Sequence, residues 1–261
     1  MYRRKNFKSK WIKPLAVIIL LNICSLVFTD PNTVSAQVFT MCANFTNCWA
    51  GHYYNQINYG SDAHIGTASI PNPNDGGVST SFMLILSAGV VNGQDSFIQT
   101  GWAVGYNGGC GNRPTVITEY MNFNIGGNPQ QRCNFGIYPA IGTDHVYTNE
   151  YNDVTLFWAH LYDGRVLQQE SSATTRFSVA AQVAAYGESN DRNIQVGGPN
   201  QGAPVLLYAL KYKPLGHGGF NYIFHPPAPT GAWGSCDPAP CPYGTQNGES
   251  AGIWWVSVWK W

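Results

Sequence analysis

Residues 96–106 read SFIQTGWAVGY, and this stretch decides the fold because its side chains alternate as those of a β-strand do. One face of such a strand is an ordinary core face, made by Ile98, Thr100, Trp102 and Val104. The other face holds a single amide among mostly small side chains, in the order Phe97, Gln99, Gly101, Ala103 and Gly105. Glycines inside a strand cost stability, so their position beside Gln99 predicts that a ligand backbone approaches closely here.

Residues 176–188, RFSVAAQVAAYGE, repeat this arrangement. Alternate residues from Val179 to Ala185 predict a core face. The outward face carries polar groups on an alanine floor: Ala180, Gln182, Ala184, Tyr186 and Glu188. If both strands belong to one curved sheet, we expect Gln99 and Glu188 to meet across a shallow cleft. The alternative is that both are solvated residues of an antiparallel sheet.

The rest of the chain predicts an all-β fold with little helix. Short β-branched or aromatic segments are divided by Gly, Pro, Asn and Asp clusters, and Asp163-Gly164 is a strong hairpin signal. We therefore expect a two-sheet antiparallel β-sandwich of the concanavalin-like, jelly-roll type. Residues 215–248 are rich in proline and predict a long irregular connection, followed by a last strand in IWWVSVWKW.

The first residues have the pattern of a secretory signal peptide. A basic start, MYRRKNFKSKWIK, is followed by the apolar run PLAVIILLNICSLVF and by small residues before Gln37. We expect residues 1–36 to be this signal and residues 37–261 to be a single secreted domain that has no membrane contact after cleavage. A single-pass membrane anchor is the alternative.

Six cysteines remain after the predicted signal, and they group as three local pairs. In an exported chain an even number of cysteines indicates disulfides. Zinc is the competing interpretation, but the spacings are not the tight ones that zinc sites use, and the six histidines form no cluster. We therefore predict no metal and no other cofactor. The expected disulfide pairs are Cys42 with Cys48, Cys110 with Cys133, and Cys236 with Cys241.

Charge argues against nucleic acid as a partner. Of the 14 basic and 14 acidic residues, six basic and one acidic lie in residues 1–36, which leaves 8 basic and 13 acidic residues and a formal charge of −5. No basic stripe remains to neutralise phosphates. The sequence makes no prediction of oligomeric state.

Several segments, in order, resemble the glutamic peptidases, both the fungal eqolisins and the plant neprosin-like proteins. IQTG resembles the eqolisin Leu-Gln-Thr-Gly and Gly101-Trp102 the neprosin-like Gly-Trp, while TEYMNF resembles Tyr-Glu-Trp-Tyr-Pro. GSDAHIGTASIPNPNDGG, FWAHLYDGRVLQQ and SVAAQVAAYGES also resemble segments of these families. The likeness covers most of residues 53–212 and leaves 213–261 as a C-terminal extension that Cys236 and Cys241 would staple.

The resemblance implies that Gln99 and Glu188 are catalytic. It also implies supporting or cleft positions for Glu119, Trp102, Gln182 and Tyr186. Matched to the eqolisin Ala-Glu-x-x-x-Glu without a gap, the chain places Gln182 and Tyr186 at the two acids, while the neprosin-like Trp-Gly-Gly-Glu places Glu188 at the second. Ile117 stands where eqolisins carry a tryptophan.

These residues predict a secreted acid endopeptidase that acts on polypeptide substrates. Glu188 would take a proton from the attacking water, and the amide of Gln99 would donate to the oxyanion. An unperturbed glutamate titrates near about 4.3, so such a base would work below neutral pH.

Two other functions fit parts of the sequence. A catalytically inactive sandwich could bind carbohydrate through aromatic residues. The candidates for that are Trp49, Tyr53, Tyr54, Trp158, Trp254, Trp255 and Trp259. GESAG at 248–252 fits the G-x-S-x-G pattern of serine hydrolases, but no histidine or aspartate follows Ser250, and a loop before it and a strand after it are not the strand and helix that the pattern needs.

Overall fold

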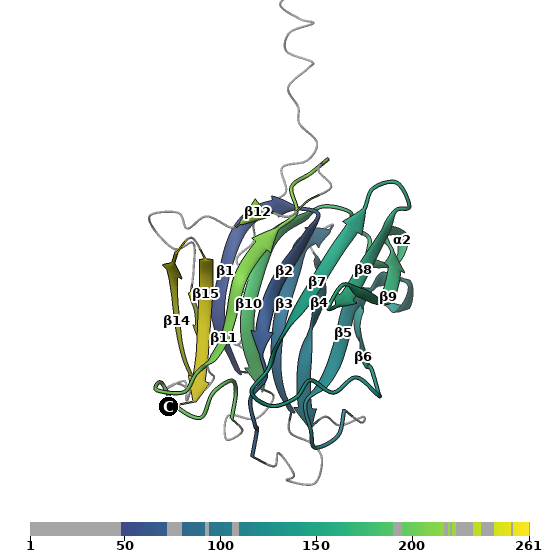
Figure 1. Cartoon of the computed structure of the whole chain (residues 1–261). Helices are drawn as coiled ribbons and strands as arrows, with labels where there is room; N and C mark the ends of the chain where they lie inside the picture. The colour runs from purple at the N-terminus through teal and green to yellow at the C-terminus, as the bar shows by residue number, and fades with distance from the viewer. Residues whose placement is uncertain are drawn as a thin grey trace, which may run out of the picture. The chain divides into compact units, whose positions relative to one another are not determined.

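The computed structural model describes residues 48–71, 80–91, 94–105, 110–189, 195–216, 219, 221–222, 232–235, 243–251 and 253–260. Within them two antiparallel sheets form a β-sandwich, which confirms the predicted fold class (Figure 1). Among the described residues, helix is limited to α2 (Ser172–Thr175) and the 3-10 turn η1 (Phe123–Ile125). No helix in the described ranges is long and apolar enough to cross a membrane.

The seven-stranded sheet contains both of the strands predicted to carry the site, with one strand between them. Each neighbouring pair is antiparallel, so the outward faces of β10 and β4 lie on the same side of the sheet. Its order is β13 (Ala232–Ser235), β1 (Cys48–Asn58), β10 (Ala180–Ser189), β3 (Thr80–Val91), β4 (Gln94–Gly105), β5 (Thr115–Asn122) and β6 (Asn128–Cys133).

The eight-stranded sheet forms the second layer. Its Asp163-Gly164 turn has both residues at positive φ, 47° and 74°, which confirms the predicted hairpin. Its order is β14 (Tyr243–Ser250), β15 (Ile253–Lys260), β11 (Val205–Tyr212), β2 (Gly60–Gly66), β7 (Asp144–Asn152), β8 (Phe157–Tyr162) and β9 (Arg165–Ser171), and β12 (Asn221–Tyr222) pairs with β11.

Three sequence expectations for individual segments were wrong. The segment before Ser250 is not a loop but strand β14, which pairs with β15 along its whole length. NIQVGG at 193–198 is one of the short segments from which the sequence predicts strands, but its described residues 195–198 form no strand, and Gly198 makes only an isolated bridge with Trp259. The missed strand β1 has glycine, histidine and asparagine among its aromatics, which weakens its β signal.

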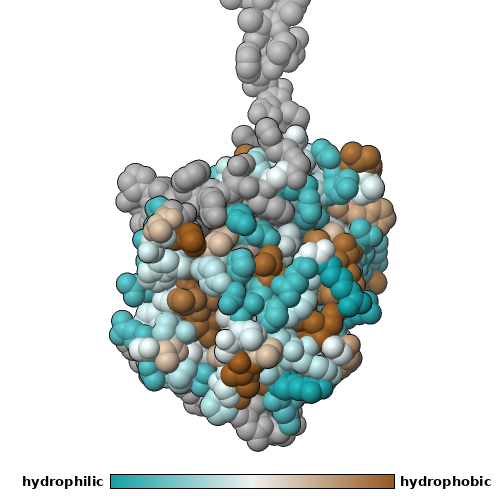
Figure 2. All heavy atoms as spheres, in the orientation of Figure 1, coloured by the Kyte–Doolittle hydropathy of each residue, from teal (hydrophilic) through white to brown (hydrophobic). Residues whose placement is uncertain are grey.

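The main core fills the space between the sheets, where the inward faces of both sheets meet. It contains Trp102, Met83, Ile85, Tyr147 and Leu207. A second apolar cluster lies on the outward face of the seven-stranded sheet and includes Leu84, Leu86, Ile117 and Ala184. On the face shown in Figure 2, hydrophobic spheres stand in small separate groups among hydrophilic ones.

A buried polar network connects the two sheets behind β4. Thr100 donates to Asn149 Oδ1 at 2.6 Å, and its hydroxyl lies 2.8 Å from Nδ1 of His160. Burial lowers the pKa of His160 to about 3, so this side chain is neutral. His160 is a residue of β8, and the described part of the chain contains no group of three or more His, Cys, Asp or Glu residues that could hold a metal ion.

Candidate functional site

Gln99 belongs to a row of residues on the outward face of the seven-stranded sheet. Its cross-strand partners are Leu86 on β3 and Glu119 on β5, and Glu119 in turn pairs with Gln131 on β6. Directly paired residues on one face have Cβ atoms about 5 Å apart, close enough for their side chains to interact. The sheet register therefore places the Glu119 carboxylate between two amides, Gln99 on one side and Gln131 on the other.

A chain of hydrogen bonds joins Tyr186, Gln99 and Glu119. The Tyr186 hydroxyl donates to Oε1 of Gln99. Nε2 of Gln99 donates to Oε2 of Glu119 at 2.6 Å. The two bonds fix the orientation of the Gln99 amide. The Glu119 carboxylate can accept only from the amide nitrogen, and the Tyr186 hydroxyl donates to the amide oxygen. One N–H of the Gln99 amide remains for another acceptor.

Burial sets the protonation states in this cluster. Gln99 and Tyr186 are 5% and 4% exposed, whereas Glu119 keeps a partial opening. Removal of its carboxyl group from water raises the pKa of Glu119 to about 7, although the hydrogen bond from Gln99 acts in the opposite direction. Burial, helped by the nearby charges of Glu188 and Glu119, raises the pKa of Tyr186 well above 10. Tyr186 is therefore a permanent hydrogen-bond donor, and Glu119 can change its charge near neutral pH.

Glu188 shares the outward face but does not contact Gln99. Ala184 is level with Gln99 across β3, and Glu188 lies four residues further along β10. Two strand spacings of about 4.8 Å and four residues of about 3.4 Å each separate the two Cα atoms by roughly 17 Å. Two extended side chains cannot form a hydrogen bond over this distance, so Gln99 and Glu188 do not touch directly, and a catalytic role for Glu188 across a cleft stays a prediction. Tyr186 takes the contact instead, as the gapless match had placed it.

Two other expected site residues lie outside the hydrogen-bonded chain. Trp102 is fully buried in the core between the sheets, where its indole N–H donates to the Gly66 carbonyl at 2.9 Å. It is therefore not a cleft residue, because its position on β4 has the opposite parity to Gln99. Gln182 lies on the outward face, as Gln99 does, but its Nε2 donates to Oδ1 of Asn55 on the neighbouring strand β1 at 3.2 Å.

The glycines near the site serve the sheet itself. A Cβ at residue 101 would lie 1.9 Å from the Met83 carbonyl oxygen, and a Cβ at residue 51 would lie 2.3 Å from Cβ of Tyr186. No side chain fits at either position without a shift of the neighbouring strand. What approaches closely is the adjacent strand, and the expectation of a ligand backbone is corrected. Gly51 leaves room for the Tyr186 side chain.

Gln131 is a member of the cluster that the sequence did not predict. Its Nε2 is buried without a hydrogen-bond partner in the described residues, on the strand next to Glu119. The short connection between TEYMNF and QQRC indicates a hairpin, and pairing these two segments could have placed Gln131 beside Glu119.

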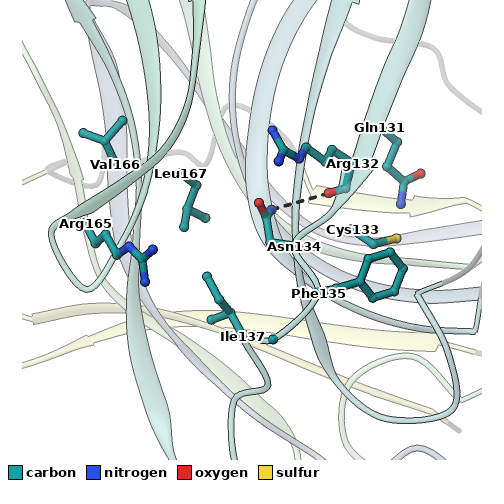
Figure 3. Close-up of a pocket in the computed structure, with 10 residues that line it drawn as sticks. Gln131, Arg132, Cys133, Asn134, Phe135, Ile137, Arg165, Val166 and Leu167 are labelled. Atoms are coloured by element: carbon teal, nitrogen blue, oxygen red, sulfur yellow. Dashed lines mark hydrogen bonds between the residues drawn. The ribbon is translucent and has the colours of Figure 1, made fainter.

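A hollow at the sandwich edge adjoins this cluster, because Gln131 is one of the residues that line it. About 700 Å³ in volume, it lies between β6 and β9 and is lined by Arg132, Arg165, Ile137 and Leu167 among others. Figure 3 shows Gln131 directed away from the side on which Ile137 and Leu167 lie. Gln131 therefore belongs to the outward face of the sheet.

One predicted disulfide is present, between Cys110 and Cys133. It connects the segment that precedes β5 to the end of β6, and so holds the Glu119 hairpin. The side chain of Cys48 and the residues Cys42, Cys236 and Cys241 lie outside the described part of the chain, so these two pairs stay predictions.

The aromatic residues considered for carbohydrate binding are mostly internal. Tyr54 and Trp254 belong to the core between the sheets, Trp158 to a smaller core, and Trp49 and Tyr53 to the buried cluster on the outward face. Trp259 is 3% exposed, and Trp255 alone of this group is only partly buried. The seven rings therefore do not line one concave sheet together, but Trp255 and Trp259 line a hollow on the eight-stranded sheet.

No family model matches the chain, and no curated protein matches it. Among solved structures, a scytalido-glutamic peptidase with a transition-state analogue inhibitor is similar at 11% identity, over 82% of this chain and 98% of that one, with a TM-score of 0.46. SCP-B, a member of the eqolisin family in complex with the tripeptide Ala-Ile-His, has 10% identity, the same coverage and a TM-score of 0.43. LamAcat from Zobellia galactanivorans has 11% identity, over 52% of this chain and 55% of that one, and a TM-score of 0.30.

Proposed function

We propose that this chain is a secreted peptidase that hydrolyses peptide bonds of polypeptide substrates without a cofactor, using Gln99 and Glu119 on the outward face of the seven-stranded sheet. The observation that carries the proposal is the hydrogen-bonded chain from Tyr186 through Gln99 to Glu119. The choice of peptide bonds rests on the resemblance of IQTG and TEYMNF to glutamic peptidase motifs.

Glu119 would transfer the protons. Its ionised carboxylate would take a proton from water as the water attacks the scissile carbonyl carbon. The resulting carboxylic acid would then give that proton to the departing amine, which returns Glu119 to its starting state. A pKa of about 7 suits both steps, because the group is neither too weak a base nor too weak an acid near that pH.

Gln99 would stabilise the oxyanion, and Tyr186 would hold Gln99 in place. The amide N–H that does not bind Glu119 is the donor available for the carbonyl oxygen as it becomes negative. The donation from Tyr186 to Oε1 prevents the amide from turning over, so the nitrogen stays on the side of Glu119. Tyr186 is thus a positioning residue.

This assignment differs from the sequence expectation in its working pH. A base with an ordinary glutamate pKa of about 4.3 would be active in acid. With Glu119 as the base, kcat/KM falls below a pH of about 7, since protonation removes the base. Glu188 would bind substrate along the same face, so Glu188→Gln should raise KM and leave the position of this pH limb unchanged.

The test is the pH dependence of cleavage of a denatured protein by the wild type and three variants. Glu119→Gln should lower kcat by about 100-fold or more, which is the usual contribution of a general acid or base. Glu249→Gln is the matched control, because Glu249 is an exposed carboxylate in the β14–β15 hairpin of the other sheet. Circular dichroism of each variant checks folding. An inert wild type, or a Glu119→Gln variant of full activity, would overturn the proposal. Loss of activity in Glu188→Gln with an acid optimum would return the base to Glu188.

A further inference from the structure

Three planar side chains stand side by side on the outward face of the eight-stranded sheet. Trp255 on β15 pairs with Tyr208 on β11, which pairs with His64 on β2. The rings of His64 and Tyr208 are stacked, with centroids 4.8 Å apart and planes 19° apart. The Trp255 indole lies over Gly248, where a Cβ would be 2.5 Å from its Cζ2. Gly248 thus lets the indole lie close to the sheet, and Trp255 remains partly exposed.

A row of residues with polar side chains at both ends runs beside these rings. Gln246 pairs with Ser257, and Ser257 with Leu206, while Asp144 pairs with Gly66 at the other end. Oδ2 of Asp144 accepts the Tyr208 hydroxyl at 2.5 Å and lies 3.3 Å from Nδ1 of His64. Oδ1 accepts no hydrogen bond from the described residues, and the Asp144 side chain is 49% exposed. The hydrogen bond from Tyr208 lowers the pKa of Asp144, so the carboxylate stays charged in mild acid.

Two hollows lie over these rows and share three residues, Pro204, Leu206 and Tyr208. The first has a volume of about 370 Å³ and is lined by Trp255, Trp259 and Gln246 as well. The second has a volume of about 250 Å³ and is lined by Asp144 and residues of the loop before β7. The two hollows adjoin at these three residues, and together they cross the strands from β14 to β7. We call the two together the ring groove.

We propose that the ring groove binds a neutral oligosaccharide, lying across the strands with its sugar rings against Trp255 and Tyr208. The C–H face of a pyranose is apolar and packs on an aromatic ring, while its hydroxyl groups need donors and acceptors at the edge. The ring groove supplies both, since Gln246 and Asp144 lie in the row beside the rings. The site is on the opposite sheet from Gln99, so it is independent of the proposed peptidase.

The width of the sheet gives the length of the ligand. The ring groove crosses β14, β15, β11 and β2 and ends at Asp144 on β7, which is four strand spacings or roughly 19 Å. A pyranose unit extends the chain by about 5 Å, so three to four units fill the groove. A protein partner is less suited, because the apolar part of the groove, Leu206 and the rings, is narrow and bordered by polar groups.

The experiment measures binding of cellohexaose and mannohexaose to the full chain by calorimetry and by tryptophan fluorescence, with the corresponding disaccharides beside them. We expect one hexaose to bind with a Kd of roughly 1 mM or tighter. We expect the disaccharide to bind at least tenfold more weakly, because it spans only about half of the groove. Trp255→Ala should reduce the hexaose affinity at least tenfold, and Asp144→Asn should reduce it less.

Phe157→Ala is the matched control. Phe157 is another exposed ring on the eight-stranded sheet, 39% exposed, at the far end on β8. The Phe157→Ala variant should bind the hexaose as tightly as the wild type does. If Trp255→Ala does not fold, Gln246→Ala and Asp144→Asn test the same groove from exposed positions. Absence of binding by the wild type, or equal loss in the Phe157→Ala variant, overturns the proposal, and so does binding that is equal for disaccharide and hexaose.

Discussion

Replacing Glu119 with glutamine should change how the stability of the protein depends on pH. Burial raises the pKa of this carboxyl group from 4.5 to about 7 in the folded chain. The folded state therefore binds the proton more tightly than the unfolded state does. The resulting stabilisation is fully present below about 4.5 and is lost as the pH rises through about 7. Glutamine resembles the neutral carboxylic acid and has no proton to lose, so the variant should lack this part of the pH dependence.

The size of the effect follows from the shift in pKa. The difference between about 7 and 4.5 is about 2.5 pH units, and each unit corresponds to about 1.36 kcal/mol, which gives about 3 kcal/mol. The wild type should lose this much of its free energy of unfolding between pH 4 and pH 8 through Glu119. Glu119→Gln should therefore be about 3 kcal/mol more stable relative to the wild type at pH 8 than at pH 4.

Urea unfolding followed by tryptophan fluorescence measures both proteins at pH 4, 5, 6, 7 and 8. Subtracting the two curves removes the titrations that both proteins share. Glu249→Gln is the control for the loss of one exposed carboxylate. A difference between wild type and Glu119→Gln that stays constant within about 1 kcal/mol would show that the carboxyl group is not desolvated as argued.

Three further outcomes follow from the same cluster and its surroundings. Tyr186→Phe should lower kcat while leaving KM nearly unchanged, and should cost about 1 to 3 kcal/mol in urea unfolding because the Gln99 Oε1 atom is left buried without its donor. Gly51→Ala should destabilise the fold by about 1 to 3 kcal/mol, measured by thermal unfolding, since the new Cβ would overlap with Tyr186. Cys110→Ser with Cys133→Ser should cost about 3 kcal/mol of unfolding free energy, because the disulfide closes a loop with a sequence separation of 23 residues.

Alternation along the strands correctly predicted which side chains point between the two sheets, although the outward faces of β4 and β10 are largely buried as well. The period of two placed Trp102 and Val104 in the core and Gln99 outside it, because the side-chain direction depends only on the position within one strand. The same rule placed Tyr186 and Glu188 on one face of β10. It could not say which of them meets Gln99, since that depends on the register of β10 and β4 against β3. Register is fixed by pairing across the sheet, so it cannot be predicted from the sequence of one strand alone.

Hydrogen bonding and burial also distinguish Glu119 from Glu188, which the strand pattern alone does not. Glu119 and Glu188 are both glutamates on outward strand positions, and composition gives them the same pKa. The structure gives Glu119 a contact with Gln99 and a carboxyl group withdrawn from water. Burial of this kind arises from residues far apart in the chain, here β4, β5 and β10, which no short motif specifies.

The identity of the residue at 186 restricts which chemistry Gln99 can support. A glutamate there would place a second titrating acid against the amide, whereas the Tyr186 hydroxyl keeps its proton near neutral pH and in acid, since its pKa is well above 10. It can therefore orient Gln99 but cannot take a proton from water. Of the two groups that bond to the Gln99 side chain, only Glu119 can gain or lose a proton near neutral pH. A base limb in the pH profile at about 7 would thus identify Glu119, and a limb near about 4.3 would point to a carboxylate outside this hydrogen-bonded chain.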